Sequence, residues 1–571
     1  MSAARPGSGQ RSHIVTVALE DYYHVGAFNR LVQRGEWYRF ESRLELGARR
    51  TLDLLDAHGV SATFFALGWV ADTMPELVAE IAGRGHEIAS KGYYHRDITQ
   101  MSPGEFVDDL ARAREALQRA SGRRILGYRV AGKWLQPEDL WVLDVLAGEG
   151  YTYDSSLAPI FRQYAAQPWR RFAHTHTSAE GSLTEFPISS MRIAGLTLPI
   201  GGGNYLRQLP SWLVRAGTER FVADQQSPFV LYFHTWELDP DQPRITAASA
   251  PQQLRHYRNL ERMPERLSWF FDNWKFASVG DYLGNGPAAP MTYTTPIAEH
   301  RASRVATKRV SAGTERVPIT VVVPCFNEEL ILPYLANTLR SVEARMSQGY
   351  ALRFVFVDDG SSDGTGRALH QIFGDWPGSV IVHLVSNSGV AAAILHGIKH
   401  SSTEIVCSID CDCTYDPHEL ERMIPLLGDG VAMVTASPYH PDGLVRNVAK
   451  WRLFLSRGVS RLYRRVMHNQ LSTYTSCFRV YRRGVVQGIT LDRGGFLGVT
   501  ELLGRLDLAG HRIVEYPTTL EVRMLGRSKL RVLRAIGGHL GLLAKLVLMR
   551  LARTRQQGAM AAHGGVDQSA R

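Results

Sequence analysis

Cysteine is scarce in this chain, because only five cysteines occur among 571 residues. All five lie in the second half, and none has the paired spacing that is typical of a zinc site. Free thiols are stable in a reducing compartment. The N-terminus is polar and contains no apolar core segment of a signal peptide. We therefore expect a cytoplasmic protein.

Acidic residues are absent between Val522 and Val566, a stretch that contains many arginines and lysines. A basic patch of this kind can attract nucleic acid. However, no Phe, Tyr or Trp is interleaved with these charges, so nucleic-acid bases would have no stacking platform. We expect no nucleic-acid partner.

Long hydrophobic runs are also absent. The leucine-rich segment 530–553 is interrupted by Arg531, Arg534 and Lys545, so it lacks the ~20 apolar residues that span a bilayer. It is predicted to form a basic amphipathic helix. Two interpretations stay open, a helix lying on the inner face of the cell membrane, or a helix packed on a sheet with a solvated basic face.

The length of the chain predicts at least two domains, each large enough for its own core. Apolar residues make up 44% and charged residues 21%, as in ordinary globular proteins. The composition along the chain predicts a disordered N-terminus 1–11, a first domain 12–285, a Pro/Gly-containing linker 286–316, a second domain 317–529, the helix 530–553 and a disordered tail 554–571.

Paired carboxylates mark the second domain. Asp410 and Asp412 follow an apolar strand at 404–409, and a carboxylate pair of this kind suits Mg²⁺ or Mn²⁺ bound to a diphosphate. Further predicted strands near 319–323, 353–357 and 380–385 also end in polar motifs. Strands that alternate with helices indicate a mostly parallel, doubly wound sheet, whose ligands bind at the carboxyl ends of the strands.

Four motifs in residues 317–550 resemble glycosyltransferase family 2, in its dolichol-phosphate mannose synthase-like branch. They are Val-Pro-Cys-Phe-Asn-Glu (323–328), Val-Asp-Asp-Gly-Ser-Ser-Asp-Gly-Thr (357–365), Asp-Cys-Asp (410–412) and Thr-Ser-Cys-Phe-Arg (475–479). The resemblance implies a GT-A fold, which is Rossmann-like with a mixed, mostly parallel sheet. It also implies metal-dependent, inverting sugar transfer from a nucleotide-diphosphate donor, in cell-envelope or other glycan biosynthesis.

The same resemblance assigns roles to individual residues. Asp412 would hold the metal, with Asp410 nearby. Asp358 and Asp359 would read the base and ribose of the nucleotide. The remaining candidates are Pro324, Asn327, Glu328 and Gly389 in the nucleotide-sugar pocket, and Arg452, Arg523 and Lys529 at the phosphates of donor or acceptor.

The acceptor is less clearly indicated than the donor chemistry. A phosphate acceptor is already an anionic nucleophile, whereas a hydroxyl acceptor needs a carboxylate base. Glu501 is the candidate base, or else a structural anchor of the last core helix. This chain has Thr473 and Cys477 where the branch often has Asp and Gly, and Pro438 where Arg is common. The predicted acceptor is a polyprenyl phosphate or a glycan, and the predicted donor is of the GDP-mannose or UDP-N-acetylhexosamine type.

The first domain also alternates strands and helices, which indicates a distorted (β/α) barrel with its functional groups at the strand ends. Residues 12–285 resemble the polysaccharide deacetylase family. The likeness is carried by Ala-Thr-Phe-Phe-Ala-Leu-Gly-Trp-Val (62–70), Gly-His-Glu-Ile-Ala-Ser (85–90) and the order of the strand-end motifs. Such enzymes bind zinc with a carboxylate and two histidines, and they remove N-acetyl groups from amino sugars.

The departures from that family fall on its chemistry. Ala18 stands where the family has the aspartate base, and Lys91 stands where it has the first zinc histidine. A protonated ammonium has no lone pair for a metal, but its charge could replace the metal by pairing with Glu20 or Asp21. We expect a degenerate pocket without zinc, in which Glu20, Asp21, Lys91, His95, Arg129 and His234 remain.

Three hypotheses follow for the whole chain. The favoured one is a glycosyltransferase with an inactive deacetylase-like domain that binds sugar or serves assembly. The second is a bifunctional transferase and N-acetyl-sugar deacetylase, which Ala18 and Lys91 disfavour. The third is a carbohydrate-binding scaffold, which the Asp410/Asp412 pair disfavours.

Overall fold

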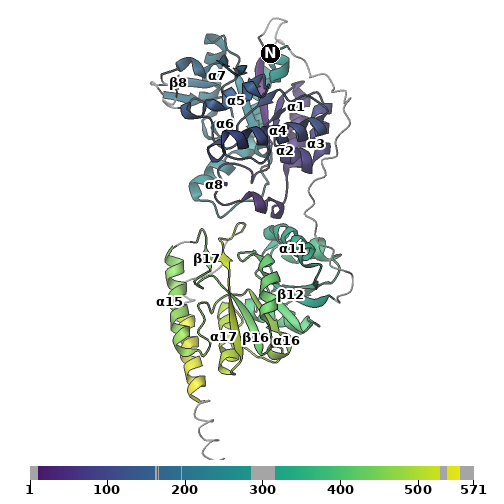
Figure 1. Cartoon of the computed structure of the whole chain (residues 1–571), viewed down its shortest axis with the longest axis vertical. Helices are drawn as coiled ribbons and strands as arrows, with labels where there is room; N and C mark the ends of the chain where they lie inside the picture. Colours follow the sequence, from purple (N-terminus) through teal and green to yellow (C-terminus); the bar gives the residue numbers. More distant parts are fainter. Residues whose placement is uncertain are drawn as a thin grey trace, which may run out of the picture. The chain divides into compact units, whose positions relative to one another are not determined.

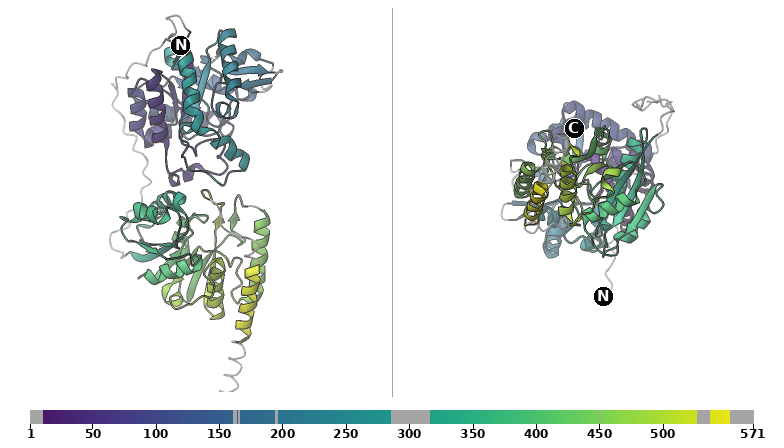
Figure 2. Two further views of the ribbon diagram at one scale, coloured as in Figure 1. Left: turned by 180° about the vertical axis from the view of Figure 1, so that it is seen from behind. Right: turned by 90° about the horizontal axis from the view of Figure 1, so that it is seen from below.

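The computed structural model describes residues 11–160, 164, 166–193, 196–284, 316–448, 450–526 and 537–552. The chain folds as two compact units, one in each half of the sequence (Figures 1 and 2). The predicted linker, the predicted tail and Lys529 lie outside the described residues, and so does the first part of the predicted helix 530–553.

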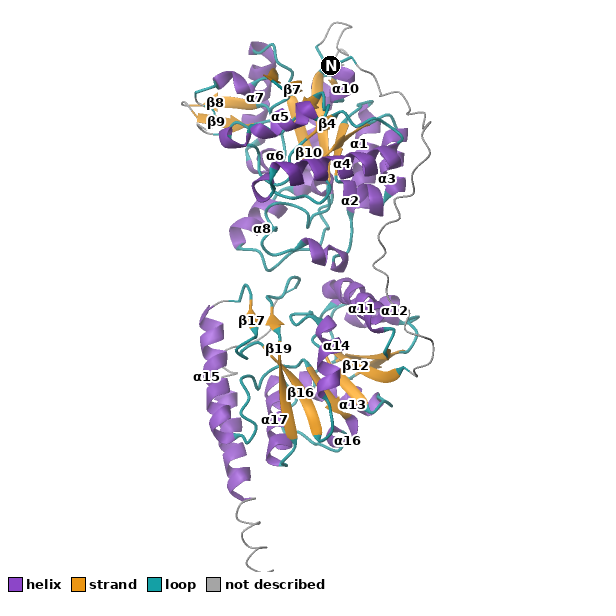
Figure 3. Cartoon of the chain, in the orientation of Figure 1, coloured by secondary structure: helices purple, strands orange, loops and turns teal. Residues whose placement is uncertain are grey.

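A curled sheet forms the centre of the N-terminal unit (Figure 3). Its strands pair in parallel from β10 through β7, and only β6 runs antiparallel at the edge. The sheet is the predicted distorted barrel. In order, the strands are β10 (Val230–His234), β1 (His13–Leu19), β2 (Thr63–Ala66), β3 (Glu87–Ser90), β4 (Gly127–Tyr128), β5 (Tyr153–Asp154), β7 (Gly181–Glu185) and β6 (His174–Ser178), with β11 (Phe276–Ala277) beside β1.

Helices surround this sheet, and local sequence explains where several of them begin. Helix α4 starts after Ser102, whose hydroxyl accepts a hydrogen bond from the Glu105 amide. The Glu105 carboxylate in turn accepts from the Ser102 amide, and this capping box satisfies two donors at the helix end. Strands β1 and β2 are buried along their whole length, as parallel strands covered by helices are. The longer helices are α1 (Leu44–His58), α3 (Pro75–Gly83), α4 (Pro103–Ser121), α5 (Trp141–Gly148), α7 (Ser211–Asp224), α8 (Ala250–Tyr257) and α9 (Met263–Asn273).

A seven-stranded sheet forms the centre of the C-terminal unit. It is mixed but mostly parallel, as predicted, because only β18 runs antiparallel to its neighbours. In spatial order the strands are β14 (Ser379–His383), β13 (Tyr350–Asp358), β12 (Val317–Cys325), β15 (Ile405–Ser408), β18 (Arg479–Arg482), β16 (Val431–Ser437) and β19 (Arg512–Pro517).

The two faces of this sheet carry different helices. Alternate strand residues point to opposite faces. Val322 and Val355 join the core beneath α13 and α17, whereas Phe356 stacks on Phe373 of α12 with ring centroids 4.0 Å apart. Parallel strands are therefore covered on both sides. The helices are α11 (Leu332–Met346), α12 (Thr365–Phe373), α13 (Val390–His400), α15 (Lys450–Val466) and α17 (Phe496–Leu508), and β17 (Leu444–Val445) pairs with β20 (Thr519–Leu520) as a small second sheet.

The described part of the C-terminal helix, residues 537–552, packs into the same core. Leu542 and Leu546 are fully buried, and they join a cluster with Tyr463 of α15 and Leu503 of α17. This burial supports the packed-helix interpretation. Leu548 on the opposite side is 67% exposed, and the membrane interpretation stays a prediction. Among the described residues no helix is long and apolar enough to cross a bilayer.

Leu546→Ala should destabilise the protein, because its buried side chain contacts the core beside Gly504 and removing it leaves a cavity. We expect a loss of about 2–4 kcal/mol, measured by denaturant or thermal unfolding of the C-terminal unit. Leu548→Ala is the matched control on the same helix, and it should change stability by less than about 0.5 kcal/mol. Equal effects of the two changes would show that this helix does not pack as described.

Candidate functional site

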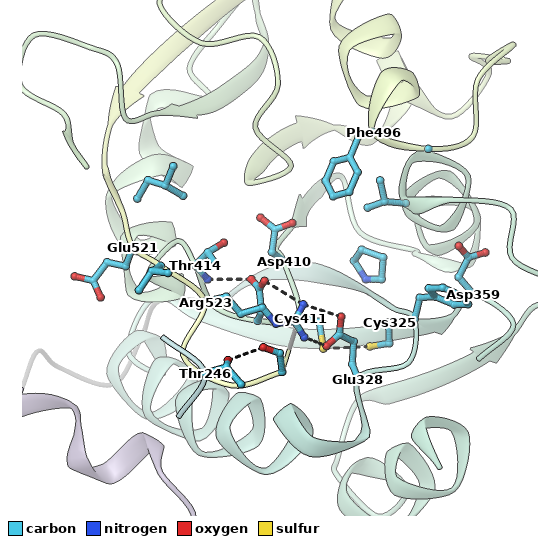
Figure 4. A pocket seen from close by; sticks show the side chains of 18 of the residues that line it. Thr246, Cys325, Glu328, Asp359, Asp410, Cys411, Thr414, Phe496, Glu521 and Arg523 are labelled. Carbon is cyan, nitrogen blue, oxygen red and sulfur yellow. Dashed lines mark hydrogen bonds and ion pairs between the residues drawn. The ribbon is translucent and has the colours of Figure 1, made fainter. Parts of the chain in front are cut away.

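A pocket of about 820 Å³ opens at the carboxyl ends of β12, β13 and β15 (Figure 4). Parallel strands bring their carboxyl ends to one edge, which is why residues far apart in sequence meet here. Six of the predicted site residues line it from the strand ends and the loops beside them: Pro324, Glu328, Asp359, Gly389, Asp410 and Asp412. Arg523, which was predicted at the phosphates, also lines this pocket.

Asp410 and Asp412 lie just beyond β15 and both face the pocket. The turn between them and the next segment is tight, since Cys413 has a positive φ of 52° and the Thr414 amide donates to Asp412 Oδ1 at 3.1 Å. Burial, and then the neighbouring Asp412 carboxylate, raise the pKa of Asp410 to about 7. Two carboxylates crowded in this way are best satisfied by a cation between them.

Arg523 supplies positive charge beside the two aspartates. Its guanidinium is held by Glu328 in a two-pronged ion pair, one prong of which is 3.1 Å long. The same group lies 3.6 Å from Asp412 Oδ2. Because bidentate pairing fixes the plane of an arginine, Glu328 orients Arg523 beside the carboxylate pair.

Asp359 ties two loops of the pocket together. Its carboxylate accepts from the backbone amides of Ser388 and Gly389 at 2.7 and 2.8 Å. Gly389 has a φ of 90°, and a Cβ there would lie 2.6 Å from the Gly494 carbonyl carbon. Only glycine fits this backbone conformation and this close approach. Asp359 and Gly389 therefore form one wall of the pocket together.

Asp358 and Asn327 are not among the residues that line the pocket. Asp358 accepts from the Ser361 amide at 3.0 Å and contacts His383 Nδ1 at 3.0 Å. Asn327, with a φ of 53°, accepts from the Ser362 amide at 2.7 Å. Both side chains hold the turn after β13, so their observed contacts shape the pocket through that turn.

Glu501 lies in α17, is fully buried and does not line the pocket. Its carboxylate accepts from Arg505 at 2.7 Å and from Lys545 at 3.1 Å. It also accepts from the backbone amides of Asp492 and Arg493. Of the two roles that the sequence left open, these contacts favour the structural anchor.

Two of the predicted phosphate ligands cannot be placed. Lys529 lies outside the described residues, and Arg452 is described only as part of the backbone of α15. Conversely, the pocket contains residues that the motifs did not single out, among them Phe496 and Glu521. Phe496 is 51% exposed at the start of α17. The sequence feature that could have indicated it is an aromatic residue directly after two glycines.

Two thiols also line the pocket. Cys325 at the end of β12 and Cys411 between the two aspartates are both buried, with their Sγ atoms 3.7 Å apart. The contact with Cys325, and then burial, raise the pKa of the Cys411 thiol well above its usual range. The two buried sulfurs contribute apolar surface to the lining of the pocket.

The predicted degenerate pocket of the N-terminal unit is centred on Glu20, which follows β1. Its Oε1 lies 2.5 Å from Lys91 Nζ and 3.0 Å from His95 Nε2, and His234 Nδ1 lies 3.1 Å from Oε2. Although burial opposes it, Lys91 and then the two histidines hold the pKa of Glu20 well below its usual range. The ammonium thus pairs with Glu20, one of the two partners that the sequence suggested.

Asp21, the neighbour of Glu20, has a structural role in its contacts. Asp21 is buried and accepts from the Ser42 hydroxyl and from the amides of Arg43 and Leu44, so it caps the start of α1. Burial raises the pKa of Asp21 to about 6.

No group of three or more His, Cys, Asp or Glu in the described parts of the chain is arranged to hold a metal ion.

Arg129 carries a polar group without a partner. It is buried, donates to Thr16 Oγ1 at 2.9 Å and to Ser155 Oγ at 2.7 Å, but its Nη1 has no hydrogen-bond partner among the described residues. Burial lowers the pKa of Arg129 to about 10. Ala18 is on the same face of β1 as Thr16, because it lies two residues further along the strand. A methyl group there offers nothing to that guanidinium.

Family models match three segments of the chain. "Glycosyl transferase family 2" matches residues 320–490, "Polysaccharide deacetylase" matches 40–136, and a "domain of unknown function" (DUF3473) matches 155–284. The last two segments lie in the N-terminal unit, and the first contains strands β12 to β18 with the paired aspartates.

Individual relatives match about two fifths of the chain. Polyprenol monophosphomannose synthase of Mycolicibacterium smegmatis is 30% identical over 217 residues, 37% of this chain and 80% of the relative. Dolichol-phosphate mannosyltransferase of Pyrococcus furiosus is 26% identical over 215 residues, and the match spans 59% of its length. A solved structure of glucosyl-3-phosphoglycerate synthase from Mycobacterium tuberculosis aligns with 41% of this chain and 80% of its own, with a TM-score of 0.31 and 21% identity.

The C-terminal unit places its paired aspartates, oriented arginine and glycine-bounded loop in the one pocket that the transferase motifs predict. Through this unit the chain belongs to glycosyl transferase family 2, and its N-terminal unit is polysaccharide deacetylase-like.

Proposed function

We propose that this glycosyltransferase moves a sugar from a nucleotide-diphosphate donor to a polyprenyl phosphate. The observation that carries the proposal is the meeting of Asp410, Asp412 and Arg523 in one pocket. A leaving nucleoside diphosphate develops negative charge, and a cation and an arginine fixed beside it stabilise that charge. The two curated relatives are named for polyprenol and dolichol phosphate mannosyl transfer, which supports this class of acceptor.

Asp410 and Asp412 would hold a divalent cation, Mg²⁺ or Mn²⁺. Both are carboxylates that face a pocket with room for a diphosphate, and Asp412 raises the pKa of Asp410 although Arg523 lies nearby. Mg²⁺ is commonly bound by one or two carboxylates together with substrate phosphates, so this donor set fits. When bound, the ion would neutralise the phosphate oxygens of the leaving group.

Arg523 would bind the donor phosphates next to the proposed metal site. Glu328 fixes its guanidinium near Asp412, so the arginine is already in position before the substrate arrives. Preorganised charge costs no rearrangement during the reaction. Arg452 and Lys529 would add further positive charge to donor or acceptor phosphate.

The wall formed by Pro324, Asp359 and Gly389 would hold the nucleoside and sugar. Asp359 already accepts from two amides, and its outer oxygen lone pairs remain able to accept from ribose hydroxyls. Asp358 and Asn327 would act through the turn they stabilise. The donor is proposed to be of the GDP-mannose or UDP-N-acetylhexosamine type.

The acceptor phosphate would attack the anomeric carbon while the nucleoside diphosphate leaves, a single displacement that inverts the anomeric centre. An anionic phosphate oxygen needs no base. The contacts of Glu501 are consistent with a reaction that needs no base, because its buried carboxylate accepts hydrogen bonds from Arg505 and Lys545. A glycan acceptor is the second candidate, and it would require a base among the pocket carboxylates.

The N-terminal unit is proposed to be a non-catalytic sugar-binding or assembly module. Lys91 and His95 both contact Glu20, which leaves that carboxylate committed within the chain and disfavours zinc there. The base position is Ala18. For the whole protein we propose a cytoplasmic location, peripheral at the inner face of the cell membrane, where a lipid-linked acceptor would be found.

Asp412→Asn should reduce metal-dependent glycosyl transfer and sugar-nucleotide cleavage by at least about a hundredfold, because an amide loses the charge that holds the cation. The assay is release of nucleoside diphosphate from a panel of GDP- and UDP-sugars with polyprenyl phosphate, with and without Mn²⁺. Asp442→Asn, at an exposed carboxylate in the same unit, is the control and should leave turnover unchanged. Unchanged turnover in Asp412→Asn would remove the proposed metal site.

Glu501→Ala should lower stability by about 2 kcal/mol, because two backbone amides lose their side-chain acceptor and Arg505 and Lys545 keep only Asp492 as an ion-pair partner. Activity per folded molecule should stay within a few-fold of the unaltered protein. Thermal unfolding and the rate constant kcat are measured together. Glu404→Ala, which removes an exposed ion pair with Arg482, is the control for a surface carboxylate. A stable but inactive Glu501→Ala would instead identify a base.

The unaltered N-terminal unit should release no acetate from N-acetylglucosamine oligomers. Ala18→Asp with Lys91→His should restore zinc binding and acetate release, since an imidazole would replace the ammonium and a carboxylate would stand at the position of the base. Zinc content by atomic absorption and acetate release are the readouts. Ala18→Asn with Lys91→His controls for size without charge and should release less acetate. Chelator-sensitive acetate release by the unaltered protein would contradict the degenerate pocket.

A further inference from the structure

A second pocket lies in the N-terminal unit, within the segment of unknown function at residues 155–284. It has a volume of about 300 Å³, at the small end of the range for small-molecule sites. Helices α7 and α9 form its walls, and α6 (Asn204–Gln208) contributes Leu206. None of its lining residues belongs to the Glu20 cluster, so it is a separate site.

Three arginines line this pocket: Arg215 on α7, Arg262 just before α9, and Arg266 on α9. In the described part of the chain none of them forms an ion pair with a carboxylate, and the only side-chain hydrogen bond that they make is from Arg266 to the Leu209 carbonyl at 3.2 Å. In the same unit Arg207, by contrast, is paired with Glu237 at 2.6 Å. Three arginines against one carboxylate, Glu265, give the lining of this small space a net positive charge, which attracts an anion.

The remaining lining is suited to a sugar. Trp269 is half-buried beside the pocket, with the Arg215 guanidinium carbon 5.1 Å from its ring centroid, and Phe270 and Val214 form a buried apolar floor. An aromatic surface packs against the C–H faces of sugar rings.

Polar groups add a second requirement on the ligand. Glu265 and Ser211 also line the pocket. A carboxylate among three arginines repels a bare anion but accepts hydrogen bonds from hydroxyl groups. The lining therefore matches a molecule that carries an anionic group and hydroxyl groups at once.

We infer that this pocket binds an acidic sugar, a monosaccharide unit bearing a phosphate or a carboxylate. The arginines would bind the anionic group, Glu265 and Ser211 the hydroxyls, and Trp269 the ring. The segment of unknown function would then be a saccharide-binding element of the N-terminal unit. This inference does not depend on the reaction proposed for the C-terminal unit.

Isothermal titration of the full-length protein tests the inference with four probes: glucose 6-phosphate, glucuronate, glucose and inorganic phosphate. We expect saturable binding of at least one acidic sugar, with glucose and inorganic phosphate each at least about tenfold weaker. The phosphate and carboxylate probes distinguish the two sources of negative charge. Absence of saturable millimolar binding by either acidic sugar, or equal binding of glucose, would overturn the inference.

Arg215→Gln with Arg262→Gln locates the binding. Both side chains are exposed, so the fold should persist, and thermal unfolding checks this. The double variant should weaken acidic-sugar binding by at least about tenfold, while glycosyl transfer is unchanged. Arg220→Gln, an exposed arginine of α7 outside the pocket, is the matched control and should bind normally. Unaltered affinity in the double variant would place the binding elsewhere and refute this site.

Discussion

The pairing of β12 with β13 on one side and β15 on the other is the constraint on which the transferase site depends. In this register Cys325 lies beside Asp358, and Val322 lies beside Ser408, so all three strands end at one edge. A slip of one residue would turn every side chain to the opposite face. The buried valines of the strands fix the register, and thereby set where the two carboxylate pairs emerge.

The sequence predicted this edge well, and for a physical reason. Strand ends are visible in sequence as an apolar run followed by polar residues, and parallel topology brings such ends together. Asp359, Asp410 and Glu328 therefore line the pocket as expected. Asp358, adjacent in sequence to Asp359, points into the turn instead, because successive residues at a strand end face opposite ways.

Other features were not legible in the sequence. Glu501 is fully buried on α17, and its partners Arg505 and Lys545 come from one turn away and from another helix. No spacing rule predicts the second contact. Likewise the segment 537–552 reads as amphipathic, but amphipathicity does not say whether a protein core or a lipid surface covers the apolar side. Burial of Leu542 and Leu546 shows that the protein core covers one side of this helix.

In the N-terminal unit the ammonium group of Lys91 balances the buried negative charge of Glu20. Lys91 is covalently part of the polypeptide, so the neutralisation of Glu20 arises with folding itself. A chelator cannot remove this lysine, and a protein of higher affinity cannot compete for it. The neutralisation of Glu20 by Lys91 therefore requires no metal ion, because the lysine is encoded in the gene.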